Sequence, residues 1–312
     1  MIDFVLLGAG LVILLFAGDA LVRGAVNASL RLGIPALIVS LTVVAFGTSA
    51  PELLVAIRAA FADAPGIALG NVVGSNTANV LLVLGLPAIM SGLAAGESDT
   101  RKSYVIMLGA TVLFIVLSFF GPLRWIHGLI MLAALALVLG ENLHEARSHR
   151  RRGSEVEVEG AEEGMSWRRI LIYLGLGLVG LPIGADLMVK GAVAIARDFN
   201  ISETVIGLTI VALGTSLPEL ATTVMAAIRR EADVALGNII GSNMFNLLGI
   251  MGVTTLLAQV PVDREFLVLD FWVMLASSLL LIPFVFWRQK ITRLWGVILT
   301  GLYLVYVVVL LS

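Results

Sequence analysis

The fold is decided by the stretch LTVVAFGTSAPEL at residues 41–53, because it returns as LTIVALGTSLPEL at residues 208–220. Working outward from this pair, a shift of 167 residues aligns 19–85 with 186–252 without a gap, and 28 of the 67 aligned positions are identical. Unrelated hydrophobic segments would not share Asn, Ser, Thr, Pro and Glu in register. The chain therefore contains an internal duplication.

The composition indicates a polytopic membrane protein. Of the 312 residues, 59% are hydrophobic and only 13% are charged, whereas a soluble domain has about 45–50% apolar and about 25% charged residues. The net charge of −2 leaves no basic face for nucleic acid. The absence of cysteine excludes disulfides, thiolate chemistry and cysteine-ligated metals.

The apolar runs predict an all-α fold with ten transmembrane helices, since a spanning helix needs about 20 mostly apolar residues. The expected ranges are 3–31, 36–61, 66–91, 103–121, 124–143, 168–197, 203–229, 233–258, 266–287 and 293–311.

These helices divide into two five-helix halves, residues 1–143 and 168–312, joined by a polar linker at 144–167. The best-matching repeat motifs lie at 41–85 and 208–252. Because five is odd, the second copy enters the membrane from the opposite side. Such inverted repeats are typical of secondary transporters, which place their site at the repeat interface near mid-bilayer.

The basic residues predict the orientation, because cytoplasmic loops carry the excess of Lys and Arg. With the N-terminus outside, fourteen of the 20 fall in cytoplasmic loops and four in outer loops. We expect a multi-pass protein of the cell (inner, cytoplasmic) membrane, with both termini outside and the linker in the cytoplasm.

The second helix of each half carries Gly-Thr-Ser-x-Pro-Glu, at 47–52 and again at 214–219. Proline clashes with the carbonyl four residues back, so Pro51 and Pro218 predict two half-helices with an unwound joint. Non-helical backbone at this depth is tolerated only where it lines a cavity or is buried in protein.

A glutamate follows each predicted break, Glu52 in one half and Glu219 in the other. A carboxylate at a helix centre costs about 2.5–3.5 kcal/mol on insertion scales, which indicates a compensating cation. Hydroxyls three and four residues before each glutamate share its helix face. They are Thr48, Ser49, Thr215 and Ser216.

The third helices carry GNVVGSNTAN at 70–79 and GNIIGSNMFN at 237–246. Ser75 lies on the same helix face as Asn79, one turn away, and Ser242 lies likewise beside Asn246. We assign Asn79 and Asn246 to the site. For Asn71, Asn76, Asn238 and Asn243 a structural hydrogen-bonding role is about equally expected. The glycines form a small-xxx-small pattern typical of close helix packing.

All these candidate ligands are oxygens, as hard cations such as Ca²⁺ require. The lack of Cys and of intramembrane His clusters speaks against zinc or copper. Two further pairs, Asp19/Arg23 and Asp186/Lys190, are spaced as local (i, i+4) ion pairs, with a gate or relay as the alternative.

At these motifs the chain resembles the cation/calcium exchanger superfamily, specifically the prokaryotic sodium/calcium exchangers, over nearly its whole length. The resemblance implies four cation sites around Glu52 and Glu219, competition between Na⁺ and Ca²⁺ during alternating access, and three sodium ions per calcium. It also implies ligation by Ser75 and Ser242 on the third helices and by the backbone carbonyls of Ala45 and Ala212. Some family members carry an acidic residue where this chain has Asn246, and its absence makes K⁺ dependence less expected.

The function expected from sequence is a secondary antiporter exchanging Na⁺ for Ca²⁺, with no enzyme activity and no cofactor. An H⁺/Ca²⁺ antiporter on the same fold is the nearest alternative. Proton-coupled relatives typically show GNxxE, whereas this chain has GNVVG and GNIIG, which favours sodium. A cation channel is a third hypothesis, but it needs a continuous pore. The expected partners are the two ions and the lipid bilayer, without nucleic acid or an obligate protein partner.

Overall fold

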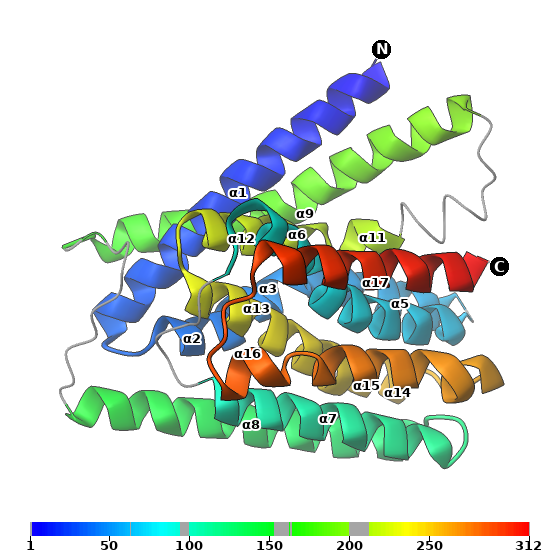
Figure 1. Cartoon of the computed structure of the whole chain (residues 1–312). Coiled ribbons are helices and arrows are strands. Elements are labelled where there is room, and N and C mark those ends of the chain that lie inside the picture. Colours follow the sequence, from blue (N-terminus) through cyan, green and yellow to red (C-terminus); the bar gives the residue numbers. More distant parts are fainter. Residues whose placement is uncertain are drawn as a thin grey trace.

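The computed structural model (Figure 1) describes residues 2–62, 64–93, 100–152, 162, 164–199 and 212–311. In this part of the chain the secondary structure is helical, apart from two isolated β-bridges. One joins Leu93 to Ile291 and the other joins Leu123 to Val260. Each bridge therefore connects a loop of the first half to a loop of the second.

The first half contains a long helix, a broken helix, a third helix with a π-helical turn, and two further helices. They are α1 (Ile2–Leu32), α2 (Ala36–Val39), η1 (Ser40–Val44), α3 (Ala45–Thr48), α4 (Ala50–Phe61), α5 (Pro65–Ala78), η2 (Asn79–Val83), α6 (Gly85–Ser91), α7 (Arg101–Phe119) and α8 (Trp125–Arg152).

The second half repeats this order within the described residues. Its elements are α9 (Trp167–Asp198), α11 (Ala212–Thr215), α12 (Leu217–Ile228), α13 (Ala232–Met244), η4 (Phe245–Ile250), α14 (Met251–Leu257), η5 (Phe266–Asp270), α15 (Phe271–Leu279), α16 (Ile282–Phe286) and α17 (Arg293–Leu311).

Eight described helical segments are long and apolar enough to span a membrane, and the bent segment from Ala36 to Phe61 makes a ninth. The helix expected at 203–229 is described only from Ala212, and its apolar part is α12. One boundary was wrong: α8 continues to Arg152, inside the stretch predicted as linker. At about 1.5 Å per residue α8 measures about 42 Å, so it exceeds a hydrocarbon core of about 30 Å.

The two predicted helix breaks lie between the Gly and the Pro of each motif, at Ser49 and Ser216. The helix axis bends by 43° between Thr48 and Ala50. Ser49, at the bend, is not in a helical conformation, with φ −80° and ψ 7°. Ser216 has nearly the same angles, φ −87° and ψ 4°. Pro51 and Pro218 each lie in the first turn of the following half-helix, where their missing N–H costs no hydrogen bond.

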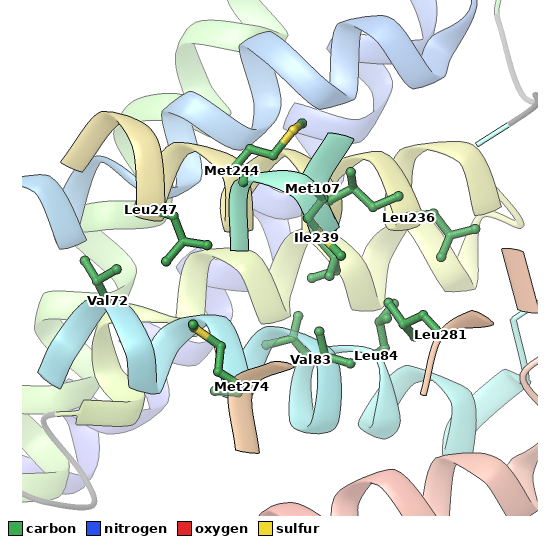
Figure 2. Close-up of a cluster of buried hydrophobic side chains, with 14 of the residues drawn as sticks. Val72, Val83, Leu84, Met107, Leu236, Ile239, Met244, Leu247, Met274 and Leu281 are labelled. Carbon is green, nitrogen blue, oxygen red and sulfur yellow. The ribbon is translucent and has the colours of Figure 1, made fainter. Parts of the chain in front are cut away.

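The third helices form the centre of the molecule. Every residue of α13 except Asp233 is buried, and apolar side chains from α5, α7, η4 and α15 pack around it (Figure 2). A π-helical turn follows α5 at Asn79 and follows α13 at Phe245. Such turns are rare and frequently mark functional sites.

Helices α1 and α9 lie side by side and run obliquely to the other helices (Figure 1). Their backbones approach closely through glycines, as small residues allow in membranes. A Cβ added to Gly184 would lie 2.9 Å from the Leu14 nitrogen, and one added to Gly10 would lie 2.7 Å from the Gly184 carbonyl oxygen. These glycines therefore set the spacing of the pair.

Candidate ion-binding site

The two glutamates lie in corresponding positions, each in the first turn of a half-helix after the break. Glu52 belongs to α4 and Glu219 to α12, and both side chains are completely buried. The N-terminus of a helix favours a negative charge because its backbone N–H groups point outward. The break thus places each carboxylate at the end of a helix that stabilises it.

Five buried oxygen atoms here have no hydrogen-bond partner among the described residues. They are Oε1 and Oε2 of Glu52, Oε2 of Glu219, Oδ1 of Asn79 and Oδ1 of Asn246. Nearly all buried polar atoms in proteins are hydrogen-bonded, so an unpartnered group requires an explanation such as a bound ion. Four unpartnered acceptor groups divided equally between the two halves form a set suited to a cation.

Hydroxyls from both halves surround Glu219. Ser49 donates to Oε1 of Glu219 at 3.0 Å and Ser242 donates to the same oxygen at 3.4 Å. The Thr48 hydroxyl lies 3.3 Å from the Ser242 hydroxyl and donates to Oδ1 of Asn238 at 3.1 Å. The broken helix of the first half therefore contacts the third helix of the second.

The reverse contact joins the broken helix of the second half to the third helix of the first half. Thr215 donates to Oδ1 of Asn71 at 3.2 Å, and Ser216 donates to the Ser75 hydroxyl at 3.4 Å. The Thr215–Asn71 contact is the symmetric copy of the Thr48–Asn238 contact, because each residue is shifted by 167 positions. Glu52 has no such hydroxyl partner among the residues that the structure describes, so the two copies differ at the carboxylates there.

Ten of the twelve residues predicted from sequence thus come together through side chains at the interface of the two halves. The other two were predicted through backbone carbonyls. The carbonyl of Ala45 already accepts the Ser49 N–H at 3.1 Å and lies 3.3 Å from the Thr48 hydroxyl. Ala212 begins α11, and its side chain lies outside the described residues.

The four remaining asparagines have hydrogen-bonding roles. Asn71 and Asn238 accept from the threonines, and Asn76 and Asn243 bond to each other and to the predicted ligands Asn79 and Asn246. The sequence placed them in the motif but left their roles open, because orientation of an amide depends on partners in the other half.

The glycine pattern packs closely in the second half only. A Cβ on Gly241 would lie 2.6 Å from the Ala45 Cβ and 2.7 Å from the Leu41 carbonyl oxygen. Among the described atoms, none lies within 4 Å of a Cβ built on Gly74. The packing prediction is therefore confirmed for Gly241 and not for Gly74.

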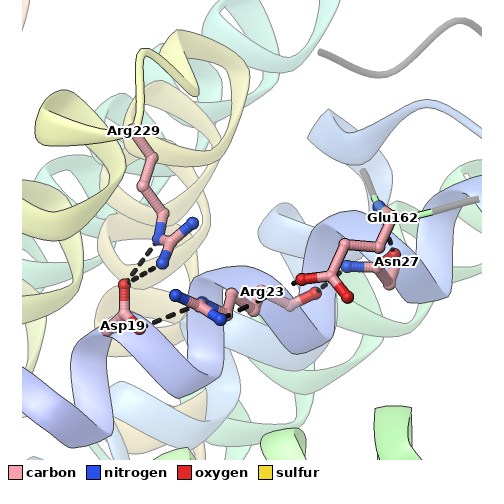
Figure 3. Close-up of polar contacts among 5 residues, drawn as sticks. All are labelled: Asp19, Arg23, Asn27, Glu162 and Arg229. Atoms are coloured by element: carbon pink, nitrogen blue, oxygen red, sulfur yellow. Dashed lines mark hydrogen bonds and ion pairs between the residues drawn. The ribbon is translucent and has the colours of Figure 1, made fainter. Parts of the chain in front are cut away.

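The ion pairs of the first helices differ between halves. Asp186 and Lys190 form an exposed local pair at 2.6 Å. Asp19 pairs with Arg23 at 3.1 Å but also with Arg229 at the end of α12 (Figure 3). The repeat did not predict this contact, because Ala62 occupies the position equivalent to Arg229.

The chemistry of the site matches hard cations. Within the described ranges no group of three or more His, Cys, Asp or Glu could hold a metal ion. The available donors are two carboxylates, hydroxyls and amide oxygens, which Ca²⁺ and other hard cations accept. The described residues of the site include no thiolate or imidazole, the ligands that zinc and copper prefer.

Comparison with known proteins agrees with this chemistry. The sodium/calcium exchanger MaX1 of Methanosarcina acetivorans is 33% identical, covering 99% of this chain and 98% of its own. The inner membrane protein YrbG of Escherichia coli is 34% identical, covering 98% of this chain and 95% of its own.

The fold is also similar to that of a solved exchanger structure. A solved structure of the sodium-calcium exchanger NCX_Mj, soaked with 2.5 mM Na⁺ and 0.1 mM Ca²⁺, superposes with a TM-score of 0.83 at 32% identity, covering 99% of this chain and 98% of its own. The chain therefore has the ten-helix inverted-repeat fold of a multi-pass membrane transporter and is not an enzyme. Residues 2–140 and 169–312 match the family model described as sodium/calcium exchanger protein, and the chain belongs to this family of cation/Ca²⁺ antiporters.

Proposed function

We propose that this protein exchanges Na⁺ for Ca²⁺ by alternating access, with both ions bound between the two halves. The observation that supports this most directly is the set of five unpartnered buried oxygens on Glu52, Glu219, Asn79 and Asn246. Two carboxylates neutralise one Ca²⁺, and amide and hydroxyl oxygens complete a shell of some six to eight ligands. The same oxygens suit Na⁺, which is also a hard cation.

The remaining predicted ligands complete the proposed site. The hydroxyls contact Glu219 or a polar side chain of the opposite half, as described above. They are Thr48, Ser49, Ser75, Thr215, Ser216 and Ser242. We include the carbonyls of Ala45 and Ala212 because a carbonyl oxygen has a second lone pair.

Proton coupling is the alternative, since two buried carboxylates could carry two protons in place of sodium ions. The test is ⁴⁵Ca²⁺ uptake into proteoliposomes loaded with Na⁺, with K⁺, or with an acidic interior. We expect uptake to need internal Na⁺. Uptake driven by the pH gradient alone would replace this proposal by H⁺/Ca²⁺ exchange, and uptake without any counter-ion would indicate a channel.

We further propose that both termini face outward and that the 144–167 segment faces the cytoplasm, because Lys and Arg concentrate on that side. The chain has no cysteine, so single cysteines at Ser148 and Ser312 can be labelled specifically. A membrane-impermeant maleimide added to intact cells should label the Ser312 position alone. Labelling of only the Ser148 position would invert the topology.

A further inference from the structure

Asn76 and Asn243 form a reciprocal amide contact where the two third helices meet. The Nδ2 of Asn76 donates to the carbonyl oxygen of Asn243 at 3.3 Å, and the Nδ2 of Asn243 donates to the carbonyl oxygen of Asn76 at 3.5 Å. The two residues differ by 167 positions, so the repeat relates them to each other. Both side chains are buried, with 1% of their surface exposed.

These backbone contacts fix the orientation of the two amides. A carbonyl oxygen can only accept a hydrogen bond, so each amide must present its nitrogen to it. The Oδ1 of each is then left to accept elsewhere. Oδ1 of Asn243 accepts from Nδ2 of Asn79 at 3.0 Å, and Oδ1 of Asn76 accepts from Nδ2 of Asn246 at 3.0 Å.

The orientation of these two amides also determines the orientation of the proposed ligands Asn79 and Asn246. Because Asn79 and Asn246 use Nδ2 in these bonds, the group they leave without a partner is Oδ1. An amide turned the other way would offer N–H donors to a cation and repel it. The four amides therefore form one ordered set, in which two backbone carbonyls determine which atoms a cation meets.

We propose that Asn76 and Asn243 are positioning residues that turn the amide oxygens of Asn79 and Asn246 toward the transported cations. This inference rests on the proposed function of the site. The action is crosswise: Asn76 of the first half orients Asn246 of the second, and Asn243 orients Asn79. Groups that orient metal ligands in this way typically change metal affinity by about 10–100-fold when removed.

The experiment measures Ca²⁺ binding by calorimetry to the purified full-length protein in detergent, together with Na⁺-driven ⁴⁵Ca²⁺ uptake. We expect Asn76→Ala to raise the Ca²⁺ dissociation constant about tenfold or more. The matched control is Thr77→Val, because Thr77 is an equally buried neighbour on α5 whose hydroxyl bonds to the Val73 carbonyl of its own helix. Thr77→Val should leave the dissociation constant unchanged.

A double-mutant cycle separates positioning from general loosening of the helices. Once Asn246→Ala has removed the ligand oxygen, adding Asn76→Ala should weaken binding little further. In the Asn79→Ala background, in contrast, Asn76→Ala should raise the Ca²⁺ dissociation constant by the same factor as it does in the wild-type protein. A merely structural role would give the same factor in both backgrounds, and that result would overturn the proposal, as would unchanged binding by Asn76→Ala.

The mirror cycle provides a second test. If Asn76→Ala does not fold, Asn243→Ala should couple to Asn79→Ala and not to Asn246→Ala. Failure of both variants to fold would make the pair a structural contact and would also overturn positioning. Failure of the proposed function would look different. The double-mutant cycles would still show the expected coupling in Ca²⁺ binding, but the wild-type protein would show no Na⁺-driven uptake.

Discussion

Replacing Glu52 by glutamine removes one of the two buried carboxylates while keeping the shape of the side chain. Both oxygens of Glu52 lack a hydrogen-bond partner within the part of the chain that the structure describes, so no described hydroxyl compensates for the lost charge. A unit charge and a divalent cation about 4 Å apart attract by about 8 kcal/mol at an effective dielectric constant of about 20. The lower desolvation cost of glutamine offsets part of this energy.

Even a net loss of about 4 kcal/mol would weaken Ca²⁺ binding about a thousandfold. We therefore expect Glu52→Gln, and likewise Glu219→Gln, to abolish ⁴⁵Ca²⁺ uptake into Na⁺-loaded proteoliposomes. The matched control is Glu141→Gln. Glu141 is exposed and pairs with Lys102 at 2.5 Å, and such surface pairs contribute only about 0–1 kcal/mol.

Three measurements decide whether the glutamate result concerns the site. Purified Glu52→Gln must elute as a monodisperse protein and unfold at a temperature near that of the wild type. Uptake must then be followed over Ca²⁺ concentrations reaching the millimolar range, so that a weakened site is not mistaken for a lost one. Uptake by Glu52→Gln within a few-fold of wild type at equal Ca²⁺ would refute the assignment of this carboxylate.

The other predictions concern packing, ion pairing and voltage. Gly241→Ala should destabilise the protein by about 1–3 kcal/mol because its Cβ would clash with Ala45 and Leu41, whereas Gly74→Ala should have little effect; thermal unfolding in detergent compares them. Arg229→Gln should lower the free energy of unfolding by about 1.5–3 kcal/mol, because it removes the charged hydrogen bond to Asp19; the same measurement tests this. If three sodium ions exchange for one calcium at two carboxylates, as we propose, one positive charge crosses the membrane per cycle, worth about 2.3 kcal/mol per 100 mV. An inside-positive potential, set with a K⁺ ionophore, should therefore increase Ca²⁺ uptake into Na⁺-loaded vesicles, and indifference to potential would exclude three sodium ions.

Most of the fold could be predicted because hydrophobic length and the repeat are properties of the sequence itself. The helix breaks at Ser49 and Ser216 followed from Gly and Pro at fixed spacing, and the burial of Glu52 and Glu219 followed from their depth in the apolar runs. The extension of α8 to Arg152 did not follow. Its last residues, HEARSHRRR at 144–152, are polar, and hydropathy marks only the part of a helix that lies in lipid.

The candidate site residues could be named from the sequence, but their contacts could not. Asn76 and Asn79 lie three residues apart on one helix, yet Asn79 bonds to Asn243 of the other half. No periodicity within one helix contains that information, since it depends on how two helices approach across the interface. The same holds for Asp19 and Arg229, which are 210 positions apart and have no repeated counterpart.

The hydroxyl and amide residues of the site recur at equivalent positions in both copies, yet Glu52 and Glu219 differ in their contacts. Ser49 donates to Glu219, but its equivalent Ser216 donates to Ser75, and among the described residues Glu52 has no hydroxyl partner. Equivalent site residues with different contacts mean that the two halves hold different conformations here. In an inverted-repeat transporter, exchanging these conformations between the halves produces the state that opens to the other side of the membrane. The unequal hydrogen bonding of two equivalent glutamates is therefore what one end of such a cycle requires.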